Sequence, residues 1–473
     1  MSIRHLDFLF RPRSVALVGA SDREHIVCAA VILNLLGSRF AGPVFPMHPA
    51  RRSIAGVHAY AEVRDLPEVP DLAIVCAPAD TVPGWVSSLG AAGTRAVAIL
   101  TDGVEHAAVL DAAKPFLMRV LGPNSMGLLV PVLGLNASFA PTAAAHGPLA
   151  FVSQSGALLA AALDWAASRR IGFSYAVSLG DSVDVDIADV LDFLGGDAST
   201  RAVLLYMESL RVGRKFLSAA RAVSRGKPVI VMKSGRTRAG AAIVLQRTGL
   251  STSDDAVFDA AIARAGMLRA YTIAELFEAA ETLGQMHVAA RSKLAVVTNA
   301  SGPAVVAVDT AEASGAELAG MPVALGVDAT VSRYADSLGW ALAKSPQDTV
   351  LLLHAPSALV GAEQVAEGCK AAASRAGRVG AVCRSTWRPA RRSPLRTSTC
   401  AQARTAAQAA AKRKGSRRLR WRGALAVQRH APPRLHHTGN GLVPITLLLG
   451  ARVRPDLRCS ANPKSPRRTS LRI

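Results

Sequence analysis

Short apolar runs that end in loops rich in Gly, Pro or Asp recur along the first 375 residues and alternate with helical patterns. Ser14–Val18 ends at Gly19, a helical pattern covers Ala29–Leu36, and Val44–Pro46 is the next apolar run. This alternation at this spacing is typical of a doubly wound parallel sheet with helices on both faces. The same pattern predicts further strands at Asp71–Ala77, Ala96–Leu100, Ala150–Val152, Ser174–Ser178, Ala202–Tyr206, Pro228–Met232, Lys293–Thr298 and Thr349–His354.

Hydrophobic residues make up 50% of the chain, but aromatic residues only 5%. The cores must therefore consist mostly of Ala, Val and Leu, which favours strands buried between helices over an aromatic-rich β-sandwich. The 473 residues are enough for three domains of ordinary size. The pattern predicts α/β domains at 1–135, 145–285 and 290–375, the third incomplete, followed by a tail at 376–473.

The net charge of +21 belongs to the tail. From residue 376 onward there are 23 Lys and Arg against one acid, Asp456, whereas residues 1–375 hold 32 basic and 33 acidic side chains. A segment rich in Arg, Pro and Ser cannot bury enough apolar surface to offset the entropy of ordering, so we expect a disordered tail. Two interpretations stay open: a nucleic-acid-binding arm, or a stretch never selected to fold.

The cysteine pattern and the hydropathy exclude several classes of protein. The six cysteines contain no CxxC pair, which argues against a zinc cage or a disulfide framework and fits a reducing cytosol. The N-terminus has no apolar signal region, and the best apolar run, Leu442–Leu449, is too short to span a bilayer. We expect a soluble, cytoplasmic protein without a membrane partner.

Three loops that contain glycine follow predicted strands, where α/β proteins often bind ligands. Gly19–Cys28 opens a helix, although its two acids, Asp22 and Glu24, would repel a phosphate. Gly122–Gly127 (GPNSMG) offers close backbone approach, a fixed turn and short polar contacts. Ser153–Gly156 places two hydroxyls and a glycine at a helix N-terminus, which suits an anion. For each loop, an ordinary turn or helix cap is the alternative.

Two sets of acidic residues are further candidates. Gly180–Asp186 carries three carboxylates, which suit a capped helix start better than a metal site, so we predict no bound metal. Glu208 follows a predicted strand, where it could orient a cationic or imidazole partner.

The first 375 or so residues resemble one family in many short motifs that agree in order and spacing. These motifs include VALVGAS, GPVFPMHP, DLAIVCAPA, LGPNSMGLL, FVSQSGAL, SLGDSVDVD, LLYMES and PVIVMKSGRT. They are similar to the NDP-forming acyl-CoA synthetases, the succinyl-CoA synthetase-like superfamily. Within it, FSYAVSLGDSVDVDIADVLDFL and DDAVFDAAIARAGMLR look most like bacterial protein lysine acetyltransferases of the Pat type.

The resemblance implies an α/β fold in which a Rossmann-like CoA-binding domain precedes two flavodoxin-like ligase domains. It implies coenzyme A or acetyl-CoA as cofactor, with ATP or ADP only through a separate or missing ATP-grasp domain. The CoA-site residues that it implies are Gly19, Ala20 and Ser21 by the phosphates, and Pro78, Gly122, Pro123, Asn124, Ser125 and Gly127 near the pantetheine and thiol. Ser153, Gln154, Ser155 and Gly156 correspond to residues that hold the phosphate or phosphohistidine in active ligases.

Departures from the family pattern put ligase turnover in doubt. The phosphorylated histidine of active ligases lies in an SHTG-like loop, which here reads Gln246–Gly249, so Arg247 stands at the histidine position. A guanidinium stays protonated and is not a usable nucleophile, so no catalytic residue of the relay is intact. Cys28 replaces a customary glycine and Ala50 a customary lysine, and both changes are expected to weaken CoA binding.

Three functions follow from these observations. The first is a CoA- or acyl-CoA-binding module, the sensor half of a Pat-type acetyltransferase, because the match ends near residue 375 before any ATP-grasp or GNAT domain. The second is the α-like half of an ADP-forming acyl-CoA ligase, which would work with an ATP-grasp partner subunit. The chain could also form homo-oligomers. The third is nonspecific nucleic-acid binding by the tail, if 376–473 is translated in its proper frame.

Overall fold

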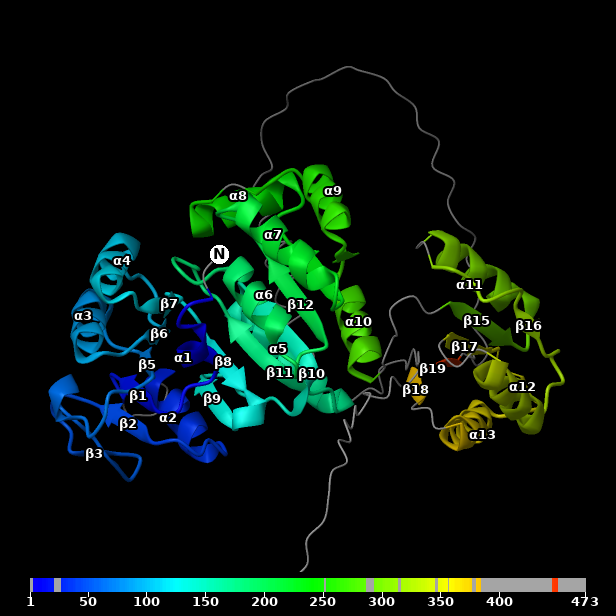
Figure 1. Cartoon of the computed structure of the whole chain (residues 1–473), viewed down its shortest axis with the longest axis horizontal. Coiled ribbons are helices and arrows are strands. Elements are labelled where there is room, and N and C mark those ends of the chain that lie inside the picture. Colours follow the sequence, from blue (N-terminus) through cyan, green and yellow to red (C-terminus); the bar gives the residue numbers. More distant parts are fainter. Residues whose placement is uncertain are drawn as a thin grey trace, which may run out of the picture. The chain divides into compact units, whose positions relative to one another are not determined.

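The computed structural model describes residues 3–20, 27–250, 252–285, 293–313, 316–344, 348–355, 357–376, 380–383 and 445–449. The chain divides into two compact units, Met1–His287 and Val288–Ile473, which are described separately (Figure 1). Two large sheets build the first unit and one sheet builds the second.

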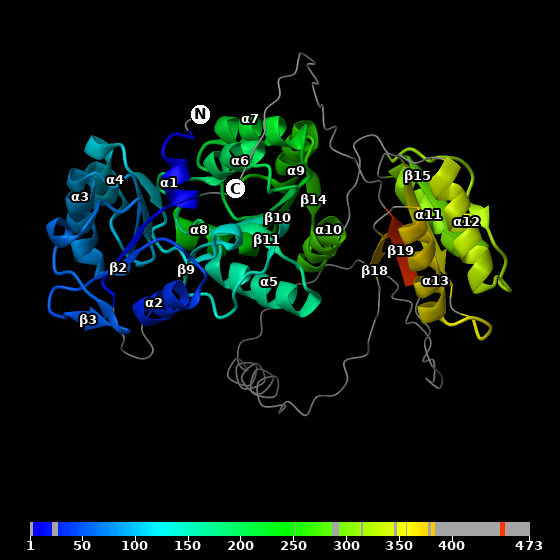
Figure 2. The same ribbon diagram turned by 60° about the horizontal axis from the view of Figure 1, so that its bottom comes forward.

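The first sheet has five parallel strands in the order β2-β1-β5-β6-β7. Its strands are β1 (Val15–Val18), β2 (Val44–Met47), β5 (Leu72–Val75), β6 (Ala96–Ile99) and β7 (Arg119–Leu121). Its helices are α2 (Val27–Gly37), α3 (Val82–Ala92) and α4 (His106–Ala113), and a small hairpin, β3 (Ser53–Ile54) and β4 (Val57–His58), follows β2. Figures 1 and 2 show α3 and α4 together on one face and α2 on the other. Both faces are therefore apolar, as the predicted continuous strands require.

The second sheet has seven strands in the order β14-β13-β12-β10-β11-β8-β9. Its strands are β8 (Gly127–Val130), β9 (Leu135–Ser138), β10 (His146–Ser153), β11 (Phe173–Ser178), β12 (Ala202–Met207), β13 (Val229–Lys233) and β14 (Leu268–Ala270). Its helices are α5 (Gly156–Arg169), α6 (Ile187–Gly196), α7 (Gly213–Ser224), α8 (Arg238–Thr248), α9 (Asp255–Ala265) and α10 (Ile273–Gln285). Apolar residues of α5 and α10 share one core, and those of α6, α7 and α9 share another.

The hairpin of β8 and β9 differs from the prediction, because it pairs antiparallel with β11 of the second sheet. The predicted domain boundary at residue 135 therefore lies at the first residue of β9. Strands β7, β8, β9 and β14 are among those that were not predicted. They are only three or four residues long, which is too short to show a periodic pattern.

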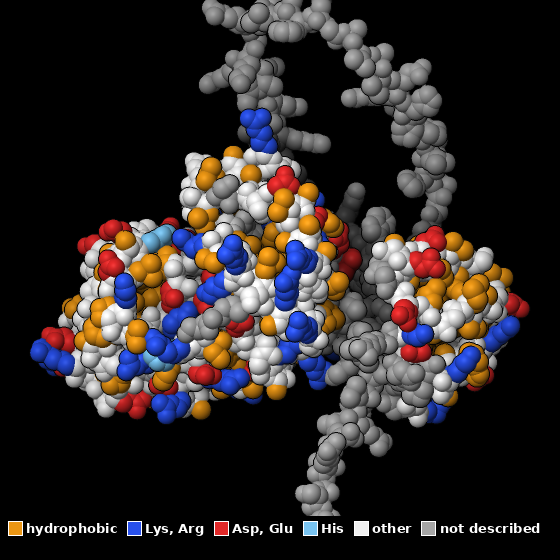
Figure 3. All heavy atoms as spheres, turned by 45° about the horizontal axis from the view of Figure 1, so that its top comes forward, with side chains coloured by type: hydrophobic (Ala, Val, Ile, Leu, Met, Phe, Trp, Pro, Cys, Tyr) orange, Lys and Arg blue, Asp and Glu red, His pale blue; other side chains and the backbone are white. Residues whose placement is uncertain are grey.

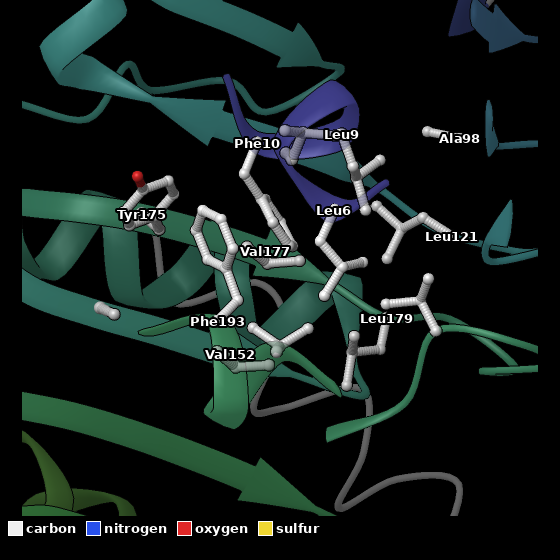
Figure 4. Close-up of a cluster of buried hydrophobic side chains, with 14 of the residues drawn as sticks. Leu6, Leu9, Phe10, Ala98, Leu121, Val152, Tyr175, Val177, Leu179 and Phe193 are labelled. Atoms are coloured by element: carbon white, nitrogen blue, oxygen red, sulfur yellow. The ribbon is translucent and has the colours of Figure 1, made fainter. Parts of the chain in front are cut away.

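Helix α1 (Leu6–Phe10) joins the cores of the two sheets in the first unit. Leu6, Leu9 and Phe10 are fully buried among side chains from both sheets, as Figure 4 shows. The Phe10 ring lies 5.8 Å from that of Tyr175 and 4.8 Å from that of Phe193, measured between centroids. The two sheets of this unit thus share a continuous apolar core.

Asp197 fixes α1 to the end of α6 by a set of hydrogen bonds. Its carboxylate accepts from Arg11 (2.7 Å), the Thr200 main chain (2.9 Å) and the Ser199 hydroxyl (2.5 Å). Burial alone would raise the pKa of Asp197, but these hydrogen bonds outweigh it and hold the pKa below its ordinary value. A carboxylate with a lowered pKa stabilises the folded state above its unfolded pKa, and this contribution is lost as the pH falls through the folded pKa.

Asp197→Asn is expected to lower the free energy of unfolding by about 1–3 kcal/mol at pH 7. The difference from the natural chain should shrink as the pH falls through the lowered pKa of Asp197, because the natural carboxyl then becomes neutral too. Denaturant unfolding at several pH values checks this. The control is Asp192→Asn, since burial raises the pKa of Asp192 and loss of its charge should not destabilise the fold. If both variants lost the same free energy of unfolding, the stabilising role of the Asp197 carboxylate would be contradicted.

The second unit holds a sheet in the order β16-β15-β17-β19-β18. Its elements are β15 (Leu294–Thr298), α11 (Ser301–Ala313), β16 (Val323–Ala324), α12 (Val331–Lys344), β17 (Thr349–His354), α13 (Ala362–Arg375), β18 (Gly380–Cys383) and β19 (Ile445–Leu449). Strand β19 pairs antiparallel with β17 and β18. The tail was expected to lack regular structure, and β18 and β19 are departures from that expectation. The other residues of the tail beyond Ala376 lie outside the described ranges.

The predicted α/β fold is confirmed, because each of the ten predicted strands has a counterpart in the three sheets. The largest difference in length is at β10, which begins at His146, four residues before the predicted start. Figure 3 shows Lys and Arg side chains interspersed with acidic and hydrophobic ones, in keeping with the near-neutral composition of residues 1–375. Within the described ranges, every helix is too short or too polar to cross a bilayer.

Candidate functional site

The first candidate site lies where the strand order of the first sheet reverses. Strands β2 and β5 flank β1 on opposite sides, so the carboxyl ends of β1 and β5 border a topological switch point. Gly19 and Ala20 follow β1, and the exposed Pro78 follows β5. Gly19 has a φ of +78°, and a Cβ there would lie 3.0 Å from the Ala77 nitrogen. The structure thus brings three predicted CoA-site residues to the switch point, where proteins of this architecture bind ligands in a crevice, while Ser21 lies outside the described residues.

The Gly122–Gly127 turn connects the two sheets of the first unit. The main-chain nitrogens of Asp181 and Val183 donate to the carbonyls of Pro123 (2.9 Å) and Gly122 (3.2 Å). The Ser125 hydroxyl donates to the Ser178 carbonyl (2.6 Å) and is buried. The turn therefore holds the end of β11 against the end of β6.

The residues of this turn divide into structural and exposed ones. A Cβ on Gly122 would collide with the Ile99 carbonyl oxygen, and one on Gly127 with that of Ala137. Ser125 is engaged by the second sheet, so these three residues serve the fold. Asn124 is exposed in a left-handed conformation with a φ of +56°, which leaves its amide directed to solvent or a ligand.

The two substitutions expected to weaken CoA binding both lie near the switch point. The Cys28 thiol donates to the Cys76 carbonyl at 3.3 Å and is buried, in the first turn of α2. Ala50 is exposed shortly after β2. Cys28 thus fills space beside the crevice, and Ala50 offers no charge to a phosphate.

The second candidate site follows β10, where Ser153–Gly156 leads into α5. Ser155 caps α5, because its hydroxyl accepts from the Leu158 nitrogen. The Ser153 hydroxyl donates to the Ser155 carbonyl at 2.7 Å and is buried. Gln154 accepts from the nitrogens of Glu208 (2.6 Å) and Ser209 (3.1 Å). This loop is therefore rigid and is joined to the end of β12.

Arg247 and Glu208 meet in a pocket beside this loop. The Arg247 guanidinium contacts the Glu208 carboxylate, which also accepts a hydrogen bond from the Tyr206 hydroxyl (3.2 Å). Glu208 is buried, whereas Arg247 is partly exposed. The sequence predicts a loop around Arg247, but the structure places it in the last turn of α8. The expectation that Glu208 orients a cation agrees with this contact.

Three further residues of the pocket were not singled out from the sequence. They are His106, Arg211 and Ser209. His106 Nε2 lies 3.1 Å from Asp181 Oδ2, and Arg211 donates to the Asp181 carbonyl at 3.2 Å. His106 begins α4, shortly after β6, and that position at a strand's carboxyl end was the available signal.

The carboxylates of Gly180–Asp186 serve the fold, as the helix-cap interpretation predicts. Asp186 caps α6 in a capping box with Asp189. Asp184 accepts from the Arg119 guanidinium (2.8 Å), and Asp181 pairs with His106. Among the described residues, no group of three His, Cys, Asp or Glu side chains could hold a metal ion.

Comparison with known families agrees with this geometry. Residues 13–131 match a CoA binding domain, and residues 146–283 match the succinyl-CoA ligase like flavodoxin domain. The alpha subunit of the ADP-forming acetate–CoA ligase I of Pyrococcus furiosus is 37% identical over 327 residues, which cover 66% of this chain and 71% of that subunit.

The chain belongs to the NDP-forming acyl-CoA synthetases. Another member, the ADP-forming acetate–CoA ligase I of Archaeoglobus fulgidus, is 33% identical over 391 residues. This match covers 76% of the present chain but only 56% of that ligase. The dinucleotide-forming acetyl-coenzyme A synthetase 1 of Candidatus Korarchaeum cryptofilum, solved with phosphate and ADP, superimposes with a TM-score of 0.73 at 31% identity. The superposition covers 79% of this chain and 86% of that one.

These relatives confirm the predicted superfamily and its CoA-binding and ligase-like domains. The expected likeness to Pat-type acetyltransferases gains no support from them, because they bear the names of ligases and synthetases. The α-like ligase alternative, kept open from the sequence, agrees better with these names.

Proposed function

We propose that this chain is the α-type, CoA-binding half of an acyl-CoA ligase system, and that it binds CoA without passing a phosphoryl group through residue 247. CoA or acetyl-CoA is the small-molecule partner. An ATP-grasp subunit would be the protein partner and would supply ATP or ADP, which this chain does not bind by itself. The observation that carries the proposal is the contact of Arg247 with Glu208 at the position of the family's histidine.

The CoA side of the proposal is supported by the first sheet. Because Gly19 has no Cβ, the loops after β1 and β5 can lie close to each other, as a bound pyrophosphate requires. Asn124 offers an exposed amide in the turn after β7. The printed description of the family matched by residues 13–131 is a CoA binding domain.

The second part of the proposal, that no phosphoryl group passes through residue 247, follows from the arginine at this position. Arg247 is a permanent cation, so its partner Glu208 is neutralised rather than free to orient an imidazole. The neighbouring Gln154 and Ser155 keep the polar side chains that suit a phosphate-binding loop. The pocket can therefore attract an anion, but it has no nucleophile at position 247.

A fully active ligase half is the second candidate, favoured by the names of the relatives. It requires a nucleophile other than residue 247. Phosphoryl transfer by the natural chain with an ATP-grasp subunit present would support this candidate over the first.

Asn124→Ala is expected to weaken CoA binding by about 0.5–1.5 kcal/mol, the value of one hydrogen bond. Calorimetric titration of the reduced full chain with CoA measures the change. The control is Lys114→Ala, which removes an exposed cation that precedes β7, whereas Asn124 follows this strand. An equal loss in both variants, or no binding by the natural chain, would contradict the proposed CoA site.

A further inference from the structure

Two cysteines face each other across the switch point of the first sheet. Cys28 is the second residue of α2, and Cys76 directly follows β5. The Cys28 Sγ lies 3.3 Å from the Cys76 carbonyl oxygen. Gly19, in the loop after β1, approaches the same Cys76–Ala77 peptide, so both thiols border the crevice proposed for CoA.

The two thiols also interact with each other. The neighbouring Cys76 thiol lowers the pKa of Cys28, against the effect of burial. The Cys28 thiol, together with burial, raises the pKa of Cys76 well above its ordinary value. The lower pKa of Cys28 makes its sulfur the more reactive of the two, and Cys76 is placed to resolve it.

We propose that Cys28 and Cys76 form a peroxide-oxidisable dithiol whose disulfide narrows the switch-point crevice. Cys28 lies in α2 and Cys76 in the β5 loop, so a bond between their sulfurs ties two elements that border the crevice. A disulfide requires an S–S distance of about 2.05 Å, so the first turn of α2 must move towards the β5 loop.

The oxidation balances with hydrogen peroxide as the oxidant. The Cys28 thiolate attacks one peroxide oxygen, the O–O bond breaks, and the departing hydroxide takes up a proton to leave as water. The Cys76 sulfur then attacks the Cys28 sulfenic acid, the S–O bond breaks, and the Cys76 proton leaves with the second water. Peroxide is scarcely larger than water, and Cys76 is only partly buried.

The disulfide does not depend on the proposed function, but its effect on CoA does. In the oxidised protein, CoA binding should be weaker by at least about tenfold, the scale of one lost hydrogen bond to a charged group. Reduction by a dithiol should restore the affinity.

The test treats the reduced full chain with hydrogen peroxide, blocks remaining thiols with N-ethylmaleimide and maps peptides by mass spectrometry without reduction. We expect a linked peptide pair containing Cys28 and Cys76, two hydrogens lighter than the separate peptides. Cys28→Ala and Cys76→Ala should each abolish it. Cys369→Ala is the matched control and should retain it, because Cys369 is buried and burial raises its pKa to about 12.

Cys28 and Cys76 that remain fully alkylated, or a Cys28 that advances to a sulfinic acid without the link, would overturn the proposal. A link that leaves CoA affinity unchanged would overturn its control of the crevice. If the reduced chain binds no CoA, the proposed function fails, and peptide mapping alone still decides whether the disulfide forms.

Discussion

Replacing Arg247 with histidine is expected to make the chain accept a phosphoryl group that the natural chain refuses. Arg247 ends α8 in contact with Glu208, so an imidazole at this position would lie within reach of the same carboxylate. Glu208 would accept a hydrogen bond from one ring nitrogen and leave the other as the nucleophile. This restores a histidine at the position where the family resemblance places one.

The variant is incubated with acetyl-CoA and radiolabelled inorganic phosphate. In the reverse ligase reaction a phosphate oxygen attacks the thioester carbonyl, the C–S bond breaks, and CoA leaves as its thiol to give acetyl phosphate. The histidine nitrogen attacks phosphorus, the bond from phosphorus to the acyl oxygen breaks, and acetate leaves. We expect acid-labile label to rise from background in the natural chain towards stoichiometric in Arg247→His. The double variant Arg247→His with Glu208→Gln should lose most of it.

Label on the natural chain would contradict the claim that Arg247 interrupts the relay. An Arg247→His protein that binds CoA but remains unlabelled would show that Glu208 and the pocket are not aligned for transfer. Arg247→Lys serves as a matched control, because it keeps a cation at the position and should stay at background.

Gly180→Ala is expected to lower the free energy of unfolding by about 2–5 kcal/mol. Gly180 has a φ of +56°, and a Cβ there would collide with the Pro123 carbonyl oxygen. That oxygen accepts from the Asp181 nitrogen at 2.9 Å, so the collision disturbs the joint between the two sheets of the first unit. Urea unfolding followed by circular dichroism measures the loss.

The control for this prediction is Gly84→Ala in α3, where a Cβ would meet nothing within 4 Å. Alanine favours helix over glycine, so this variant should be more stable by about 0.5–1 kcal/mol. If Gly180→Ala unfolds at the same urea concentration as the natural chain, the close approach of these two loops is not a constraint on the fold.

The long buried strands were predictable because their apolar runs are continuous and are separated by loops that contain Gly, Pro or Asp. The hairpin of β8 and β9 was not, because two four-residue strands carry no period, and β8 pairs with β11 through residues far apart in the chain, Leu128 with Val177. Helix α1 was also missed, since its burial between two sheets is a tertiary effect on five residues.

The candidate site was only partly predictable. Gly19 and Pro78 follow strands, and parallel strands bring their carboxyl ends together, so the crevice follows from the pattern. The contact of Arg247 with Glu208 joins two elements whose distance no local pattern encodes. His106 and Arg211 reach the pocket only because α4 and the loop after β12 lie on either side of Asp181.

The most direct test of this account is a crystal structure of the reduced protein grown with CoA and phosphate. The account predicts CoA in the crevice, with its pyrophosphate at Gly19 and Ala20 and its chain passing Pro78 and Asn124, while Arg247 remains on Glu208. CoA bound elsewhere, or a phosphoryl group carried by a side chain of the Glu208 pocket, would contradict it.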